Sequence, residues 1–206
     1  MKKLIVVLAI GALAAPAMAQ FGGLPYADSA AAPEAGLMRV SGGLVMGDDF
    51  NTYGGRFTYG VMDGLAVFGD LGLLDPDEGD SGFAYQGGAK FTLPLELPVD
   101  LAVRAAIGMA SYDVEGGDAD MTDFNGGVLA SKDLDMFTPY AFIGLNYLKW
   151  EVSADTEFGS FDADNDETDI ALAGGVIFSL TDQISLYGEV AYIDDPFFAA
   201  GGRFQF

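Results

Sequence analysis

The sequence of 206 residues contains no histidine and no cysteine, and only nine of its residues are basic against 31 that are acidic. The absence of cysteine excludes disulfides and thiolate metal sites. The absence of histidine excludes the usual Ser-His and Cys-His nucleophile pairs. Because affinity for nucleic-acid phosphates comes from Lys and Arg, the formal net charge of −22 argues against nucleic acid as a partner.

The rest of the composition is unusual for so acidic a chain. Half of the residues are hydrophobic, the mean hydropathy is +0.28, and 29 residues are glycine. This apolar and aromatic content is too high for an intrinsically disordered chain, and the glycine share is roughly twice the usual one. The fold must therefore separate many acidic groups from a large apolar surface.

The first 19 residues have the pattern of a secretory signal peptide. Lys2 and Lys3 precede an apolar stretch over residues 4–15, and Ala17 and Ala19 form a small-residue cleavage site. The apolar stretch is shorter than the ~20 residues of a transmembrane helix, and no later stretch is long enough. Removal of this segment on export would leave a mature chain with a net charge of −24.

The remainder divides at residue 37. Residues 20–36 are rich in Ala, Gly and Pro and are predicted to form a flexible periplasmic lead-in. From residue 37 onward, apolar and other residues alternate with period two, as in strands with one buried face. Most of the predicted strands are longer than the usual ~5–6 residues and match the ~9–11 residues of a membrane-crossing strand. The ten predicted strands lie near 37–46, 52–60, 64–74, 83–93, 99–112, 122–131, 138–150, 168–180, 184–193 and 197–206.

A pair of glycines recurs in every second predicted strand, and the first strand carries one as well. Each interval between recurring pairs corresponds to one hairpin, and glycines inside strands permit curvature and close packing. Five curved hairpins indicate a single antiparallel sheet that closes on itself. The pairs are Gly42-Gly43, Gly54-Gly55, Gly87-Gly88, Gly126-Gly127, Gly174-Gly175 and Gly201-Gly202.

The signal peptide, the hairpin repeat and the ending Gly201-Gly202-Arg203-Phe204-Gln205-Phe206 together resemble the small OmpA-like outer-membrane β-barrels of Gram-negative bacteria. The resemblance implies an all-β, closed, antiparallel up-and-down transmembrane β-barrel over residues 37–206, located in the outer membrane after export. It also implies that Phe204 and Phe206 form the signal read by the barrel-assembly machinery. Eight strands are common in that superfamily, so eight is the alternative to ten.

Hydrogen bonding independently favours a closed membrane barrel. Every backbone group in the hydrocarbon core must be paired, so a spanning sheet keeps no free edge. The alternative is a soluble β-sandwich or secreted barrel, which would bury its apolar face against a second sheet. Aromatic residues near strand ends favour the membrane, because they fit interfacial girdles. They are Tyr53, Phe91, Tyr140, Trp150, Tyr192 and Phe206.

Charged residues inside the strands are predicted to face the lumen, because a charge that faces lipid costs about 2–4 kcal/mol at the bilayer midplane. They could form a charged constriction in a narrow pore. They could equally form a polar network that fills a barrel whose interior is just wide enough for side chains. These predicted lumen charges are Arg56, Asp70, Lys90, Arg104, Glu189 and Arg203.

Most of the acidic residues fall in every second connection, and these connections face outside if the mature chain starts in the periplasm. In the predicted loop 151–167, Asp162, Asp164 and Asp166 alternate, and oxygen ligands at this spacing suit Ca²⁺, although the glycine of an EF-hand loop is missing. The alternatives are a solvated acidic face that loosely gathers Ca²⁺ or other divalent cations beside lipopolysaccharide, or the acidic composition of a saline habitat. No other cofactor is expected.

The sequence predicts no catalysis, because the acidic residues outside the strands lie in polar loops without an apolar pocket to tune them. The leading prediction is a monomeric outer-membrane barrel with a structural or surface-exposed role. The alternative is a narrow cation-preferring pore. The predicted partners are outer-membrane lipid, lipopolysaccharide and the barrel-assembly machinery.

Overall fold

The computed structural model describes residues 27–47, 50–76, 81–114, 117–156 and 159–206. The predicted signal peptide and its cleavage residues Ala17 and Ala19 lie outside these residues. Within the described residues, no helix is long and apolar enough to cross a membrane. The strands are β1 (Met38–Met46), β2 (Phe50–Met62), β3 (Leu65–Pro76), β4 (Gly82–Thr92), β5 (Asp100–Val114), β6 (Gly117–Ser131), β7 (Phe137–Thr156), β8 (Gly159–Ser179), β9 (Ile184–Ile193) and β10 (Asp195–Gln205).

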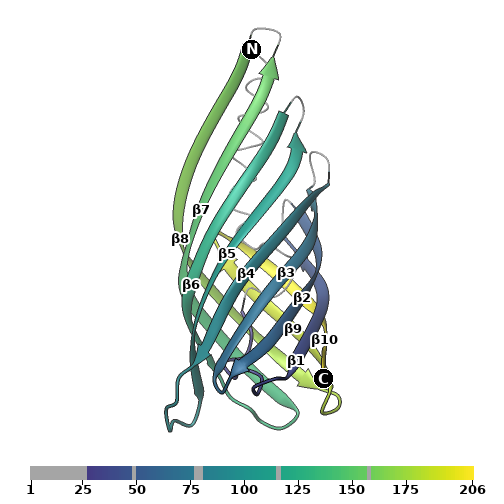
Figure 1. Cartoon of the computed structure of the whole chain (residues 1–206), viewed down its shortest axis with the longest axis vertical. Coiled ribbons are helices and arrows are strands. Elements are labelled where there is room, and N and C mark those ends of the chain that lie inside the picture. Colours follow the sequence, from purple (N-terminus) through teal and green to yellow (C-terminus); the bar gives the residue numbers. More distant parts are fainter. Residues whose placement is uncertain (1–26, 48–49, 77–80, 115–116, 157–158) are drawn as a thin grey trace.

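These strands form one closed antiparallel barrel in which each pairs with its neighbours in the sequence (Figure 1). The barrel closes between β1 and β10, in a register that runs from Arg39 opposite Gln205 to Met46 opposite Phe198. Met38 and Phe206 extend this seam with two backbone hydrogen bonds of 2.9 Å. The predicted all-β, up-and-down barrel is therefore confirmed, with ten strands rather than eight.

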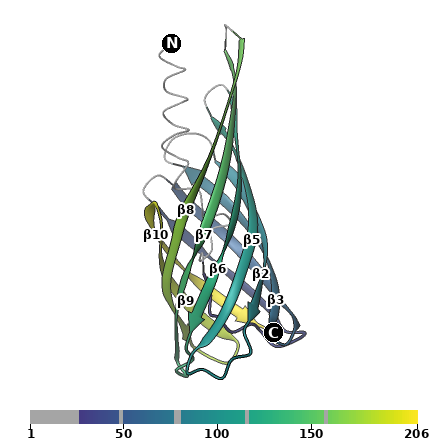
Figure 2. The ribbon, with the colours of Figure 1, turned by 90° about the vertical axis from the view of Figure 1, so that its left-hand side faces the viewer.

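The barrel wall is much taller on one side than on the other (Figures 1 and 2). β7 and β8 have 20 and 21 residues, whereas β1 has nine. The predicted loop over 151–167 is wrong in this respect, because most of it continues the β7–β8 ladder, with Glu151 opposite Asp164. Polar residues can continue a β-ladder wherever lipid does not contact it. The many acidic residues of this stretch therefore led to the prediction of a loop where the strands in fact continue.

The two faces of the wall have inverted polarity compared with a soluble barrel. Inward-facing positions hold buried polar and charged side chains, among them Asp70, Arg104 and Asn146. Outward-facing positions hold large apolar side chains that are exposed, and Leu71 is 72% exposed. A lipid environment is what such an outer surface requires. Other exposed outward residues are Phe57, Phe83, Ile107, Phe124, Ile143, Leu145, Ile170, Val190 and Phe198.

One glycine of several Gly-Gly pairs faces the lumen and leaves space for an aromatic ring from an adjacent strand. A Cβ atom on Gly43 or on Gly201 would overlap the Tyr187 hydroxyl, so the Tyr187 ring lies over both. Phe68 covers Gly88 in the same way, and Tyr140 covers Gly175. The close packing predicted from the glycine repeat is therefore the packing of inward-facing aromatic rings over inward-facing glycines.

Candidate functional site in the barrel lumen

All six predicted lumen charges have buried side chains, with exposed fractions between 2% for Asp70 and 9% for Arg203. They come from six strands, one residue from each, and share the inward-facing parity of their strands. The structure arranges them in two adjoining groups, one around a paired arginine and carboxylate in the wall, and one around the chain segment that precedes β1. Arg56 and Arg104 of the first group line a small cavity together with Lys90 of the second.

The first group is centred on Arg56 in β2 and Asp70 in β3, which lie opposite each other in the register. The Arg56 Nε and Nη2 atoms donate to the two Asp70 carboxylate oxygens, both at 2.7 Å. Such a two-point contact is the strongest arrangement of this residue pair. The Phe68 ring contacts two guanidinium groups, with its centroid 4.7 Å from that of Arg56 and 5.0 Å from that of Arg104.

Arg104 continues the first group into β4 and β6 through neutral amides. Its Nη2 atom donates to Gln86 Oε1 at 3.1 Å, and its Nη1 atom donates to Asn125 Oδ1. The Asn125 amide in turn donates to Asp123, which is fully buried. The sequence analysis missed Gln86, Asp123 and Asn125. Their inward-facing parity in β4 and β6 was the signal that could have identified them.

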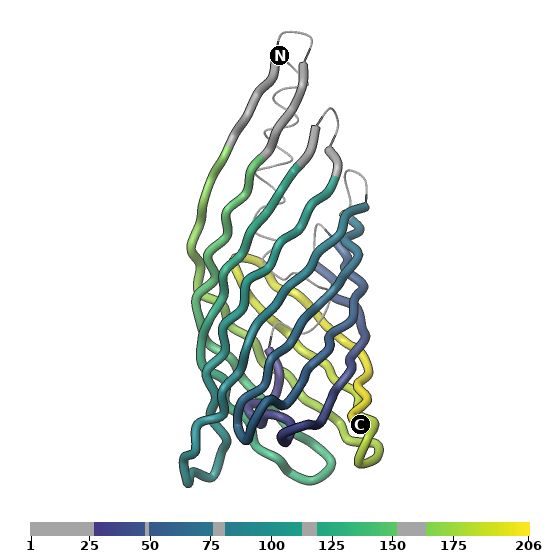
Figure 3. Tube along the Cα trace, viewed as in Figure 1, coloured from purple at the N-terminus to yellow at the C-terminus, as the bar shows by residue number. Residues whose placement is uncertain are grey.

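The second group surrounds residues 27–36, which the sequence analysis predicted to be part of a flexible lead-in. The structure instead places the start of this segment inside the barrel, where the purple tube of Figure 3 begins. The side chains of residues 27–30 are buried there. The physical reason is that side chains from the wall satisfy the polar groups of this segment, which makes burial of its backbone acceptable. The contacts are Ala27 N to Glu189 Oε2 at 3.0 Å, Ala30 N to Ser131 Oγ at 2.9 Å, Ala32 N to Thr92 Oγ1 at 3.0 Å, and Lys90 Nζ to Ser29 O at 2.6 Å.

Asp28 is the charged centre of this group. Its carboxylate accepts a hydrogen bond from Arg203 Nη2 at 2.7 Å and lies 3.4 Å from Lys90 Nζ and 3.7 Å from Arg39 Nη1. Asp28 is 6% exposed, so the three cations compensate a carboxylate that has lost its water. The sequence analysis did not single out Asp28. The available signal was that it is the only charged residue between Lys3 and Glu34.

The local sequence explains how the segment enters the barrel. Residues 27–32 carry only small side chains apart from Asp28, so they fit beside the wall. Gly36 adopts a φ of 84°, which glycine tolerates without strain, and turns the chain into β1. Gly60 in β2 lies against the backbone of the segment, and a Cβ atom there would come 2.7 Å from the Pro33 carbonyl oxygen.

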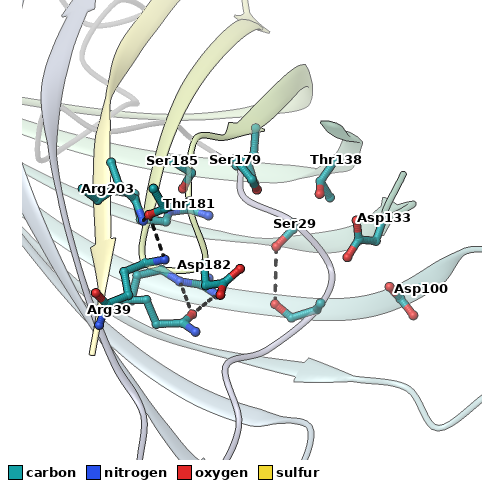
Figure 4. A pocket seen from close by; sticks show the side chains of 15 residues that line it. Ser29, Arg39, Asp100, Asp133, Thr138, Ser179, Thr181, Asp182, Ser185 and Arg203 are labelled. Carbon is teal, nitrogen blue, oxygen red and sulfur yellow. Dashed lines mark hydrogen bonds between the residues drawn. The ribbon is translucent and has the colours of Figure 1, made fainter. Parts of the chain in front are cut away.

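A polar cavity of about 220 Å³ opens at the barrel end where the segment leaves the lumen (Figure 4). Arg39 and Arg203 line one side of it, while Asp100 and Asp133 lie on the other. Hydroxyl side chains such as Ser185 lie between them. The cavity gives the second group a direct approach from solvent.

The remaining predicted residues lie elsewhere. Phe204 and Phe206 are exposed on the outside of the barrel end, with their rings stacked at 5.8 Å. Tyr53, Phe91, Tyr192 and Phe206 are exposed as a girdle requires. Tyr140 and Trp150 are buried, so their assignment to the girdle is wrong. They share the inward-facing parity of Phe142 in β7, and position near a strand end does not decide the face.

The predicted Ca²⁺ ligands lie on the tall hairpin. Asp164 and Asp166 are exposed, and the Asp162 side chain lies outside the described residues. Among the residues whose side chains are described, no group of three or more His, Cys, Asp or Glu is arranged to hold a metal ion.

A scan against protein-family models and a search of curated proteins found no match to this sequence. Solved structures do resemble it. The outer-membrane protease OmpT from Escherichia coli is similar at 9% sequence identity with a TM-score of 0.50, over 84% of this chain and 94% of that one. The N-terminal β-barrel domain of Pseudomonas aeruginosa OprF is similar at 11% identity with a TM-score of 0.43, over 84% of this chain and 100% of that one. The attachment invasion locus protein Ail of Yersinia pestis is similar at 13% identity with a TM-score of 0.36, over 84% and 99%.

These similarities concern the fold, which is the closed β-barrel of outer-membrane proteins. The sequence identities are too low to transfer an activity, and the protease activity of OmpT therefore says nothing about this chain.

Proposed function

We propose that the protein is an integral outer-membrane β-barrel with a structural, surface-exposed role and no catalytic activity. The observation that carries this proposal is the inverted polarity of the wall. In water, the exposed side chains of Leu71, Phe83 and Ile170 would have to be covered by further protein, because their contact with water is unfavourable. In a membrane, lipid tails cover them without a free-energy penalty. The buried charges would correspondingly be shielded from lipid inside the lumen.

The surface-exposed role rests on the upper part of the β7–β8 hairpin. This hairpin extends beyond the rest of the wall, at the end opposite the C-terminus (Figure 2). Glu151, Asp164, Asp166 and Glu167 are exposed on it, and Lys149 pairs with Glu151. Such a projecting acidic face would gather divalent cations loosely and lie beside lipopolysaccharide.

The lumen supports a closed scaffold rather than a permanently open, cation-preferring pore. Residues 27–30 occupy the interior at the level of Lys90 and Arg203. The buried lumen carboxylates that the structure describes all have polar partners: Asp70 pairs with Arg56, Asp28 with three bases, Glu189 with the Ala27 amide, and Asp123 with the Asn125 amide. A hydrolytic mechanism needs a carboxylate free to move a proton, so this engagement favours the non-catalytic role. A closed sheet also needs no second copy to cover an edge, in keeping with a monomer.

The proposal is tested by expressing the full chain in a Gram-negative host and fractionating the cells. The folded protein should be in the outer-membrane fraction, should require detergent for extraction, and should migrate faster on gels when unboiled than when boiled. Protease added to intact cells should cut within the β7–β8 hairpin. Recovery of the folded protein in the soluble periplasmic fraction would overturn the membrane assignment, and an uncut hairpin in a folded, membrane-extracted protein would overturn the surface role alone.

A further inference from the structure

We infer that residues 27–36 are a releasable plug held by the Asp28 carboxylate, and that release of the plug opens a lumen that prefers small anions. This inference rests on the membrane placement proposed above. It adds a conducting state to the closed scaffold and assigns a role to Arg39, Lys90 and Arg203.

The first step is that one carboxylate holds the plug. In the part of the chain that the structure describes, the ion pairs of Arg39, Lys90 and Arg203 all go to Asp28. Removal of one partner from a buried ion pair is strongly unfavourable, because it leaves uncompensated charge behind. If residue 28 were neutral, the three bases around it would repel one another. Departure of the plug would then be favourable, because water could hydrate their charges.

The second step is that the other contacts of the plug are made by small apolar side chains or are hydrogen bonds that water can replace. Its buried apolar side chains are Ala27, Ala30 and Pro33, and all three are small. The other contacts of the plug with the lumen wall are hydrogen bonds between its backbone and wall side chains, each of which water can replace. They involve Ser131, Glu189, Thr92 (with Ala30 O and Ala32 N) and Lys90 (with Ser29 O and Ala31 O). Gly36 provides a turn about which the segment can swing without disturbing β1.

The third step concerns the charges left behind. Arg56 stays paired with Asp70, and Arg104 stays bonded to the neutral amides of Gln86 and Asn125. Arg39, Lys90 and Arg203 then face the open lumen beside the solvent-accessible cavity. At this level the three bases outnumber the Glu189 carboxylate, which loses the Ala27 amide when the plug leaves, so the interior carries an excess of positive charge that attracts small anions such as chloride. Asp100, Asp133 and Asp182 also line the cavity, but they are exposed at the barrel end, where salt screens their charge. The acidic outer hairpin lies beyond this level and is screened within about 10 Å at 0.1 M salt.

The experiment compares Asp28→Asn with Glu34→Gln in planar bilayers. Both variants remove one negative charge from the same segment, but Glu34 is exposed, whereas Asp28 is buried among three bases. Purified full-length protein is first shown to be folded by its faster unboiled migration. Asp28→Asn should raise the fraction of time in a conducting state by about 100-fold, as expected from losing one partner of a buried ion pair. The Glu34→Gln variant should behave as the wild type.

Selectivity is measured from the reversal potential in a KCl gradient, where the Asp28→Asn variant should favour chloride over potassium. Lys90→Met is a second way to weaken the plug, from the wall side, and should open the lumen with a smaller anion preference. Equal silence of Asp28→Asn, Lys90→Met and the wild type would overturn the plug. A preference for potassium in the open variant would overturn the anion assignment.

A disulfide shows whether the conducting path is the one that the plug occupies. The natural chain has no cysteine, and the Ala30 amide lies 2.9 Å from Ser131 Oγ. Ala30→Cys with Ser131→Cys, added to Asp28→Asn, should close the channel when oxidised and reopen it with a reductant. Conductance that persists in the oxidised protein would place the path elsewhere. Failure of the membrane proposal would look different, since no variant would then insert into the bilayer.

Discussion

The two glycines of a Gly-Gly pair face opposite sides of the barrel wall and have different roles. Gly42 faces outward, and the nearest atom to a Cβ built there is the Gly54 carbonyl oxygen at 3.8 Å. Gly43 faces inward, where the same atom would overlap the Tyr187 hydroxyl and come 2.5 Å from the Ala200 carbonyl oxygen. Space for a neighbouring ring is thus required at one position of the pair and not at the other.

This difference predicts that Gly43→Val destabilises the barrel by at least about 1–3 kcal/mol, the usual cost of overpacking a filled core. Gly42→Val should be close to neutral, because its side chain would face outward into open space. The measurement is urea unfolding of each refolded variant in lipid vesicles, followed by the loss of the fast-migrating band. Equal destabilisation by both substitutions would mean that the glycines are required for strand curvature rather than for packing against the aromatic ring.

At the scale of strands, period-two alternation predicted the number of strands and the faces of the interior charges. It did so because lipid on one side and a filled lumen on the other impose opposite polarities on adjacent residues. The same alternation would have placed Tyr140 and Trp150 inside, but their position near strand ends was given more weight. The length of β7 and β8 was not predictable from apolar alternation. Strand residues above the membrane do not contact lipid, so apolar side chains are not needed at every second position there.

The position of the segment before β1 could not be derived from sequence pattern at all. Its residues are small and mostly uncharged, which is equally compatible with a free tail. Its location depends on Arg39, Lys90 and Arg203, which come from three strands and meet only when the barrel is closed. A contact of this kind is a property of the tertiary structure.

The upper part of the β7–β8 hairpin should be dispensable for folding. We predict that replacing residues 153–162 by Asn-Gly, which forms a tight hairpin turn, changes the free energy of unfolding by less than about 1 kcal/mol, the scale of a change in loop length. Urea titration and gel migration measure this. The shortened hairpin should also lose its site of cleavage by external protease.

The control is a deletion of Leu145 from the same strand. It moves every following residue of β7 to the opposite face of the wall and should prevent formation of the fast-migrating form. If the shortened hairpin also failed to fold, the upper ladder would be part of the folding core rather than an appendage.

For the whole molecule, the outward apolar surface determines where the protein can reside. Leu71 is 72% exposed in β3, at the strand pair that also carries Arg56 and Asp70 on its inner face. Leu71→Arg should lower the stability of the barrel in vesicles by about 2–4 kcal/mol, the cost of an arginine facing the bilayer midplane. Asp166→Arg, a charge reversal on the exposed hairpin, should change it by less than about 0.5 kcal/mol.

The measurement is the fraction folded into vesicles across a urea series. Equal stability of Leu71→Arg and wild type would show that water rather than lipid surrounds this face. The result would then support a water-soluble barrel and would leave the internal contacts of the lumen unaffected.

Asp28 also has a consequence for the order in which the chain assembles. Arg39 belongs to β1 and Arg203 to β10, the two strands whose pairing closes the barrel. One carboxylate therefore contacts both sides of the last seam, across a sequence separation of 175 residues from Arg203. A segment enclosed by a continuous ring of hydrogen-bonded strands is most simply placed there before the ring is complete. Asp28 would then be in place before β10 pairs with β1. Its contact with Arg203 would help to set the register of that last pairing.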